Sequence, residues 1–266
     1  MEVASVSTPA ALPPSWATSR LSVVIPTYNE AQNLPFLLDQ LLALELPNLR
    51  VVVVDDGSPD GTGELAQKFA DDHGGAGTSP VTVVHRRTKD GLGRAYVAGM
   101  SQALTDGAEF VAQMDADLSH PPRYLPQLLG TLLATGAGVV IGSRYVPGAS
   151  LSGDWGPGRR LLSGWANAYV RTILELPIRD VTAGYKLWRR DALEAVDLET
   201  MASSGYSFQV EAHYRAYRRG QKLVEIPIHF EDRQQGHSKM DLGVQLESAL
   251  RPFQLRRDIH RRRRAS

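Results

Sequence analysis

Two aspartates separated by one residue, Asp115 and Asp117, are the clearest candidates for chemistry in this sequence. They follow an apolar run, residues 109–114, that is typical of a buried strand, and Pro121 and Pro122 stop the strand from continuing. Carboxylates at a strand end can turn toward one point, where two like charges repel unless a cation lies between them. Magnesium and similar ions take oxygen ligands and share them with substrate phosphates. The alternative is that both aspartates simply form a turn.

The elements that must position these aspartates follow from the hydrophobic pattern of the first half of the chain. Short apolar runs alternate there with helical patterns, which predicts strands at 21–25, 50–54, 81–84, 109–114 and 139–141 and helices at 31–44, 61–70, 92–104 and 124–134. Such alternation predicts right-handed crossovers and an α/β fold with a mostly parallel sheet. Ligands bind at the carboxyl ends of strands in sheets of this kind.

Polar residues follow several of these strands directly, at 27–30, 55–56, 115–117 and 143–144. A shared site at this edge is therefore favoured over unrelated turns. Asp55 and Asp56 point to opposite sides of an extended chain, so we expect at most one to face the site and accept a hydrogen bond from a nucleotide. The other carboxylate is expected to cap the helix that begins near Gly61.

The second half of the sequence is less regular. A loop rich in glycine and proline is expected at 146–158, an amphipathic helix at 159–176, strands at 180–188 and 223–230, and a helix at 206–219. Basic side chains here could neutralise bound phosphates, although each alone is compatible with an ordinary surface charge: Arg144, Arg159, Arg160, Arg233 and Lys239.

Several classes of protein are excluded or disfavoured. The chain has no cysteine, which excludes disulfides, zinc–cysteine sites and thiol catalysis. There is no P-loop and no G-x-S-x-G motif. Gly91 and Gly93 follow a strand, but Tyr96 stands where a dinucleotide fingerprint needs a third glycine. We expect these glycines to form a tight loop beside a ligand.

The ends of the chain differ from its body. Residues 1–19 are predicted to be a disordered leader, 20–240 the folded domain, and 241–266 an amphipathic and basic tail with an apolar stripe at Leu242, Leu246, Leu250 and Phe253. Residues 256–264 carry six arginines against one aspartate. The tail therefore binds an anionic surface or merely aids solubility. No run of about 18–20 apolar residues predicts a membrane span.

Ordered motifs along residues 21–239 resemble the inverting glycosyltransferases of family 2, and within them the polyprenol- or dolichol-phosphate mannose synthases of the actinobacterial type. The motifs are VIPTYNE (24–30), VVDDGSPDGT (53–62), GLGRAY (91–96), DADLSHPP (115–122), GSRY (142–145) and DVTAGYK (180–186). Each motif is weak alone, but their order along the chain is specific.

The resemblance implies a single GT-A domain that transfers mannose from GDP-mannose to a polyprenyl phosphate with inversion. It implies that Asp117 and Arg144 are catalytic, that Arg144, Arg159 and Arg160 contact the acceptor phosphate, and that Asp117 and Ser119 hold Mg²⁺ or Mn²⁺. The donor-binding residues that it implies are Pro26, Tyr28, Glu30, Val54, Asp56, Asp115, Ala116, Asp117, Arg144, Arg233 and Lys239.

Ser119 departs from the family pattern, because relatives often carry glutamine at this position. The serine side chain is shorter, so we expect it to lose the metal contact or to make it through water. A lipid substrate implies a cytoplasmic protein attached peripherally to the inner face of the plasma membrane, by itself or with an anchoring protein. Packing against the sheet is the alternative for the amphipathic segments. Two alternatives remain. The donor could be UDP-glucose or another sugar nucleotide, or the protein could be a non-catalytic nucleotide or nucleic-acid binder, although no nucleic acid is expected.

Overall fold

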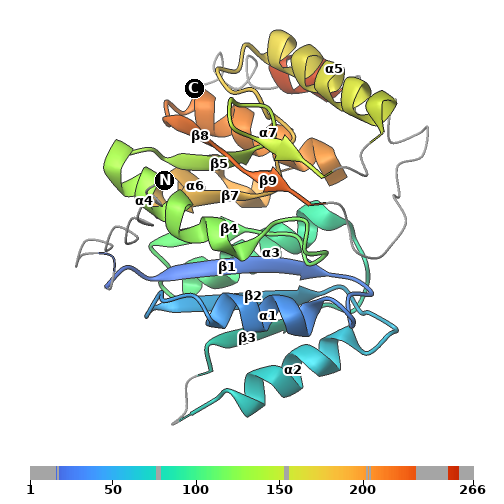
Figure 1. Ribbon diagram of the computed structural model, residues 1–266, viewed down its shortest axis with the longest axis vertical. Helices are drawn as coiled ribbons and strands as arrows, with labels where there is room; N and C mark the ends of the chain where they lie inside the picture. Colours follow the sequence, from blue (N-terminus) through green and yellow to red (C-terminus); the bar gives the residue numbers. More distant parts are fainter. Residues whose placement is uncertain are drawn as a thin grey trace, which may run out of the picture.

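A seven-stranded sheet in the order β3-β2-β1-β4-β7-β5-β8 forms the centre of the computed structural model (Figure 1). The structure describes residues 16, 18–75, 79–152, 156–201, 203, 205–231 and 251–257, without the side chains of 157, 159, 160 and 206. The strands are β1 (Leu21–Thr27), β2 (Leu49–Asp55), β3 (Val81–His85), β4 (Phe110–Gln113), β5 (Val139–Ser143), β7 (Lys186–Arg189) and β8 (Leu223–Pro227). Only the pairings of β7 within this sheet are antiparallel, which confirms the predicted α/β class with a mostly parallel sheet.

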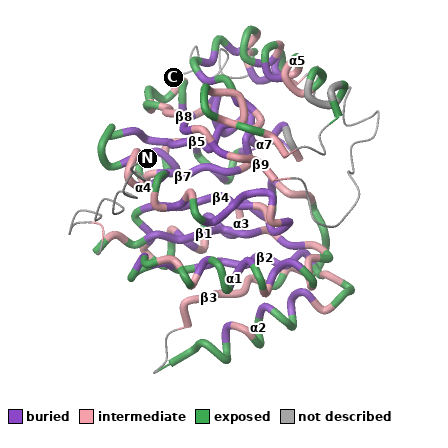
Figure 2. The backbone as a smooth tube through the Cα atoms, viewed as in Figure 1, coloured by how far each residue is buried: buried purple, intermediate pink, exposed green. Residues whose placement is uncertain are grey.

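Helices cover both faces of the sheet because successive strand residues point to opposite sides. Val23 and Ile25 pack with α1 (Leu34–Leu42), α2 (Thr62–Asp72) and α4 (Leu125–Thr135). Val24 packs on the other face with α3 (Leu92–Thr105), α6 (Arg190–Val196) and α7 (Gly205–Arg218). The last part of α5 (Pro157–Leu174) joins this second core through Val170 and Leu174. Buried residues accordingly line the strands in Figure 2.

The segment predicted as a strand at 180–188 is a strand only from Lys186 onward. Residues 180–185 form a turn that leads into β7. Because β7 is antiparallel, its first residue pairs with Gln113 at the end of β4 and with Ile141 in β5. The turn therefore lies at the edge where the parallel strands end.

The strand predicted at 223–230 is also divided. It forms β8 and, after Ile228, the short β9 (His229–Phe230), which pairs in parallel with β6 (Ser150–Leu151). The predicted 146–158 loop thus contains a strand, and its residues 153–155 lie outside the described part of the chain.

Both described ends of the chain contact the domain. The Trp16 ring lies against α4, where a Cβ at Gly130 would be 2.4 Å from it. A C-terminal helical segment, residues 251–257, lies beside α5 (Figure 1). Arg256 of this segment donates to the carbonyl oxygen of Ile173 at 2.7 Å, and Arg251 donates to Ser203 Oγ at 2.9 Å. Leu242, Leu246 and Leu250 lie outside the described residues.

A buried polar cluster joins the sheet to α7. Lys186, which is fully buried, donates from Nζ to Oε1 of Gln209 at 2.8 Å. Gln113 donates to the same oxygen at 3.2 Å and accepts a hydrogen bond from Trp188 Nε1 at 2.7 Å. Burial holds the pKa of Lys186 well below its ordinary value, against the opposing effect of the nearby carboxylates.

The buried amine of Lys186 should make stability depend on pH. The unfolded chain binds this proton more tightly, so its contribution to the unfolding free energy rises with pH between the folded pKa and about 10.4. We expect wild type to gain stability relative to Lys186→Met by up to about 1.4 kcal/mol per pH unit in that window. Urea unfolding at several pH values measures the difference. Lys68→Met, at an exposed position, serves as control. If the difference in unfolding free energy between wild type and Lys186→Met stays constant with pH, the Lys186 amine is charged in the folded protein.

Candidate active site

Asp117 lies in a tight turn that directs its carboxylate. Ser119 donates to Asp117 Oδ1 twice, from its hydroxyl at 2.6 Å and from its backbone N–H at 3.2 Å. The turn closes because Leu118 adopts a left-handed conformation with φ 62°, which is unusual for a residue other than glycine. Both Asp117 and Ser119 are buried. Ser119 therefore fixes the orientation of the Asp117 carboxylate.

Asp115 is held from two sides. Tyr96, in α3, donates its hydroxyl to Asp115 Oδ1 at 2.7 Å. Burial, followed by the charge of Asp115, raises the pKa of Tyr96 well above its ordinary value, so the hydroxyl remains a donor. The backbone N–H of Asp115 donates to Nδ1 of His120 at 3.0 Å. A Cβ at Gly184 would lie 3.4 Å from Asp115 Oδ2, so the chain of residues 180–185 passes close to this carboxylate.

His120 packs tightly beneath the two aspartates. Its ring stacks on Tyr185 at 5.2 Å between centroids and meets the Phe230 ring edge-on at 5.6 Å. Burial lowers the pKa of His120, although Asp115 and Asp117 oppose this effect. The structure therefore places His120 as a neutral support for Asp115.

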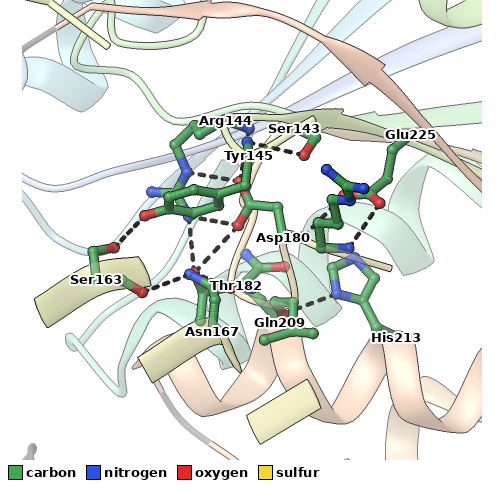
Figure 3. Close-up of polar contacts among 12 residues, drawn as sticks. Ser143, Arg144, Tyr145, Ser163, Asn167, Asp180, Thr182, Gln209, His213 and Glu225 are labelled. Carbon is green, nitrogen blue, oxygen red and sulfur yellow. Dashed lines mark hydrogen bonds and ion pairs between the residues drawn. The ribbon is translucent and has the colours of Figure 1, made fainter. Parts of the chain in front are cut away.

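Arg144 and Asp180 form a buried ion pair at the same edge (Figure 3). The Arg144 backbone N–H and Nε donate to Asp180 Oδ2 at 2.9 and 2.8 Å, and the guanidinium donates to Asp180 Oδ1 at 2.7 Å. The guanidinium also donates to Thr182 Oγ1 at 2.8 Å. Glu225 of β8 accepts the backbone N–H of Asp180 at 2.9 Å, which holds the turn in place. Arg144 is therefore fixed before any ligand binds.

Helix α5 is connected to this pair by its polar side. Tyr145 donates to Ser163 Oγ at 2.6 Å, and Asn167 accepts the backbone N–H of Thr182 at 3.3 Å. Asn167 also donates to the carbonyl oxygen of Ser163 at 3.0 Å (Figure 3). The orientation of Arg144 thus depends on the position of α5.

A second charged group lies at the ends of β2 and β3. Asp56 pairs with Arg86, which also reaches Asp90 at 3.3 Å. Burial raises the pKa of Asp56, and Arg86 opposes that effect. Asp55 instead accepts hydrogen bonds from Ser58. The expectation that one of the two aspartates caps α2 is wrong, because the N-cap residue is Gly61 and the backbone N–H of Thr62 donates to Asp60 Oδ1 at 3.1 Å.

The other predicted donor-binding residues differ in what they present. Tyr28, just after β1, has Lys89 Nζ 3.8 Å from its ring centroid, and Glu30 accepts a hydrogen bond from Asn33 at 2.9 Å. Pro26 is partly buried in β1. Val54 and Ala116 pack inside the two cores, so only their backbone could touch a nucleotide.

Some predictions concern residues that the structure does not fully describe. Arg159 and Arg160 lie in the first turn of α5 without described side chains, and Arg233 and Lys239 lie outside the described residues. The expected role of Gly93 is corrected: a Cβ there would lie 2.9 Å from the carbonyl oxygen of Ser203 and 3.0 Å from Phe208, so this glycine permits packing against the protein itself.

The oxygen-rich donors at this edge fit a hard divalent cation. Asp115, Asp117 and Ser119 offer carboxylate and hydroxyl oxygens. Within the described residues no group of three or more His, Cys, Asp or Glu side chains could enclose a metal by itself. A bound ion would therefore take further ligands from a substrate phosphate or water, as Mg²⁺ commonly does.

Sequence reasoning missed several functional neighbours: Arg86, His120, Asn167, Asp180 and Thr182. His120 lies in the DADLSHPP motif and Asp180 and Thr182 lie in the DVTAGYK motif, whereas Arg86 and Asn167 lie in none of the six motifs. Placing Asp180 and Thr182 required knowing that β7 reverses direction.

Comparison with known proteins agrees with this geometry. Residues 22–197 match the family described as Glycosyl transferase family 2. The chain is 44% identical over 225 residues to the undecaprenyl-phosphate mannosyltransferase of Micrococcus luteus, which covers 85% of this chain and 89% of that protein. It is 46% identical over 234 residues to the polyprenol monophosphomannose synthase of Mycolicibacterium smegmatis, covering 88% and 85%.

Solved structures share the fold at lower identity. Glucosyl-3-phosphoglycerate synthase from Mycobacterium tuberculosis, in complex with UDP, superposes with a TM-score of 0.64 at 20% identity, covering 90% of this chain and 80% of that chain. A complex of the same enzyme with Mn²⁺, UDP-glucose and phosphoglyceric acid gives a TM-score of 0.62 at 21% identity, covering 89% and 81%. These likenesses support the expected GT-A fold. The family match and the two curated relatives together show that this chain belongs to glycosyl transferase family 2, as a relative of the polyprenol-phosphate mannose synthases.

Proposed function

We propose that this protein transfers mannose from GDP-mannose to a polyprenyl phosphate with inversion and releases GDP. The observation that carries the proposal is the identity of 44% and 46% to relatives named as polyprenyl-phosphate mannosyltransferases, over 85% and 88% of the chain. The site is compatible with this activity because carboxylates and a fixed arginine share one edge of the sheet. The lipid-linked mannose would serve as donor for later glycan, lipoglycan or protein glycosylation.

The acceptor needs no strong general base. A phosphate monoester oxygen is already anionic near pH 7, so no proton has to be removed before it attacks the sugar. The difficulty is instead to bring a second anion next to the sugar nucleotide diphosphate. Arg144 presents a guanidinium whose orientation Asp180 and Thr182 fix. In this proposal Arg144 contacts phosphate oxygens through its guanidinium.

Asp117 is the residue that would hold Mg²⁺ or Mn²⁺, together with the donor's diphosphate. The bound ion would stabilise the negative charge that develops on the leaving nucleotide. Ser119 orients the Asp117 carboxylate by two hydrogen bonds, and it stays a proposed metal contact, direct or through water. Asp115 serves the nucleotide and Asp56 its base or ribose. The Mn²⁺ in the complexed Mycobacterium tuberculosis enzyme supports the use of a divalent ion.

The lipid tail of the acceptor requires contact with a membrane. None of the described helices combines the length and apolar composition needed to cross one. An apolar patch formed by Leu161, Leu162, Trp165, Tyr169 and Phe253 nevertheless joins α5 to segment 251–257. Leu161 and Trp165 are 76% and 62% exposed. We propose that this patch lies on the inner face of the plasma membrane, with the basic tail near anionic headgroups.

The activity is tested by incubating the protein with GDP-mannose or UDP-glucose, a short polyprenyl phosphate, and Mg²⁺ or Mn²⁺, and then detecting lipid-linked sugar. We expect mannose transfer from GDP-mannose that stops when EDTA is added. Asp117→Asn should reduce transfer at least about a hundredfold without lowering the thermal midpoint, because it removes the anionic ligand. Transfer of glucose alone, or full activity in Asp117→Asn, would contradict the proposal.

Arg144→Lys should reduce kcat/KM by about 10–100-fold, because an ammonium cannot reproduce the planar fork and its loss removes about 1.5–3 kcal/mol of charged hydrogen bonding. Steady-state kinetics with both substrates varied measures this loss. Arg189→Lys is the control, since Arg189 ends β7 at the opposite edge of the sheet and forms an exposed ion pair with Asp191. Equal values of kcat/KM in the two variants would show that Arg144 does not contribute to catalysis or phosphate binding.

Sedimentation with protein-free vesicles of anionic lipid tests the proposed membrane patch. We expect binding that weakens as salt increases, and that falls about tenfold or more in Leu161→Ser/Trp165→Ser, because each large apolar side chain contributes about 1.5–3 kcal/mol when buried. Deletion of residues 258–266 should weaken binding while keeping Arg256, which contacts α5. Phe36→Ser, which is 64% exposed on α1, is the control. Failure to bind these vesicles would indicate that an anchoring protein is required.

A further inference from the structure

The tautomer of His120 is fixed by a backbone group. The N–H of Asp115 lies 3.0 Å from Nδ1 of the ring, and a backbone amide can only donate. Nδ1 must therefore present its lone pair, and in the neutral ring the proton resides on Nε2. Tyr185 and Phe230 pack against the ring and prevent it from turning over. His120 thus carries an N–H whose direction the fold sets.

The Nε2–H group of His120 has no hydrogen-bond partner among the described residues, although the residue is only 3% exposed. His213, another buried histidine, provides a comparison for the ring nitrogens of His120. Its Nδ1 lies 3.0 Å from the carbonyl oxygen of Val181 and so carries the proton, while its Nε2 is fully enclosed without a partner. Nε2 of His120 is not enclosed in this way. A donor that is buried yet reachable is suited to a ligand.

Gly184 keeps the space beside this donor open. A Cβ at position 184 would lie 3.1 Å from Cε1 of His120, 3.7 Å from its Nε2 and 3.4 Å from Asp115 Oδ2. The glycine has no unusual conformation that would explain its presence. The absence of a side chain therefore leaves room next to the imidazole edge and the carboxylate.

His120 lies between the two charged parts of the site. Asp115 and Asp117 on one side and Arg144 and Asp180 on the other all act electrostatically on its ring. The Phe230 ring lies between His120 and Arg144, 5.6 Å from the His120 ring and 5.3 Å from the Arg144 guanidinium. A ligand that spans the carboxylates and the arginine would pass the His120 edge.

We propose that His120 Nε2–H donates a hydrogen bond to a phosphate oxygen of the bound substrates. The inference deepens the proposed function and rests on it. An N–H bond to an anionic oxygen is stronger than one to a neutral acceptor, and this donor adds no charge to a site already rich in ions. The oxygen belongs to the donor's diphosphate or to the acceptor's phosphate, and the experiment separates the two. His120 is then a substrate-binding residue as well as the support of Asp115.

Two substitutions separate these roles of His120, because each keeps one ring nitrogen's function. His120→Gln places an amide N–H near the position of Nε2, and His120→Asn places an amide oxygen near Nδ1, where it accepts the Asp115 N–H. We expect kcat/KM to fall less than about threefold in His120→Gln and about 10–100-fold in His120→Asn. The larger effect should appear in the KM of the substrate whose phosphate is bound. His73→Asn, at an exposed position, controls for loss of a histidine.

The opposite order, with His120→Asn active and His120→Gln impaired, would show that the ring only supports Asp115. Equal losses in both variants would also overturn the proposal. If either variant unfolds at a lower temperature than wild type, NMR spectroscopy of the wild-type protein tests the proposal instead. Its histidine ring nitrogens, labelled with ¹⁵N, are followed by NMR during titration with GDP and Mg²⁺, and separately with a short isoprenyl phosphate. We expect the Nε2–H signal of His120 to shift and exchange more slowly with one of them, which identifies the phosphate.

An Nε2–H signal that responds to neither ligand would overturn the proposal. Failure of the proposed function is recognised separately, because wild-type protein would then transfer no mannose from GDP-mannose. Titration with UDP and Mg²⁺ would in that case still show whether His120 binds a nucleotide phosphate.

Discussion

Strand β7 runs against its two neighbours, and this reversal brings a buried carboxylate to the edge where the parallel strands end. Asp180, in the turn before β7, is inaccessible to water and is stable as an anion only with compensation. Arg144, at the end of β5, supplies that compensation through its backbone and side chain. This ion pair sets the position of Arg144. The turn that carries Asp180 also brings Gly184 close to Asp115 and Thr182 into contact with α5.

The site separates its charges into small neutral groups. Arg144 is matched by Asp180, and Asp56 by Arg86, so neither carboxylate is isolated by burial. At the end of β4, Asp117 accepts two hydrogen bonds from Ser119, one from its hydroxyl and one from its backbone N–H. Asp115 and Asp117 together place two carboxylates at the end of β4, and such a position favours a cation from outside the chain.

The regular part of the fold was predictable because its signal is local. Apolar runs and helical periods identified the parallel strands and their helices, and the ends of those strands identified Asp115, Asp117 and Arg144 as neighbours. Strand direction carries no comparable signal, so β7 and the role of Asp180 could not be predicted from the pattern. The resemblance also implies that Val54 binds the donor, and the alternation of strand side chains, which places the Val54 side chain in the core, leaves only its backbone for that contact.

The hydrogen bonds of Arg144 have a consequence for the thermodynamics of recognition. A free arginine on a protein surface samples many rotamers, and ordering it on a ligand opposes binding by about 0.5–1.5 kcal/mol. Asp180 and Thr182 already restrict Arg144, so this loss of conformational entropy occurs during folding. An anion reaching this edge meets a guanidinium that is already ordered. Its affinity then depends on electrostatics and desolvation, with little entropic penalty from the protein.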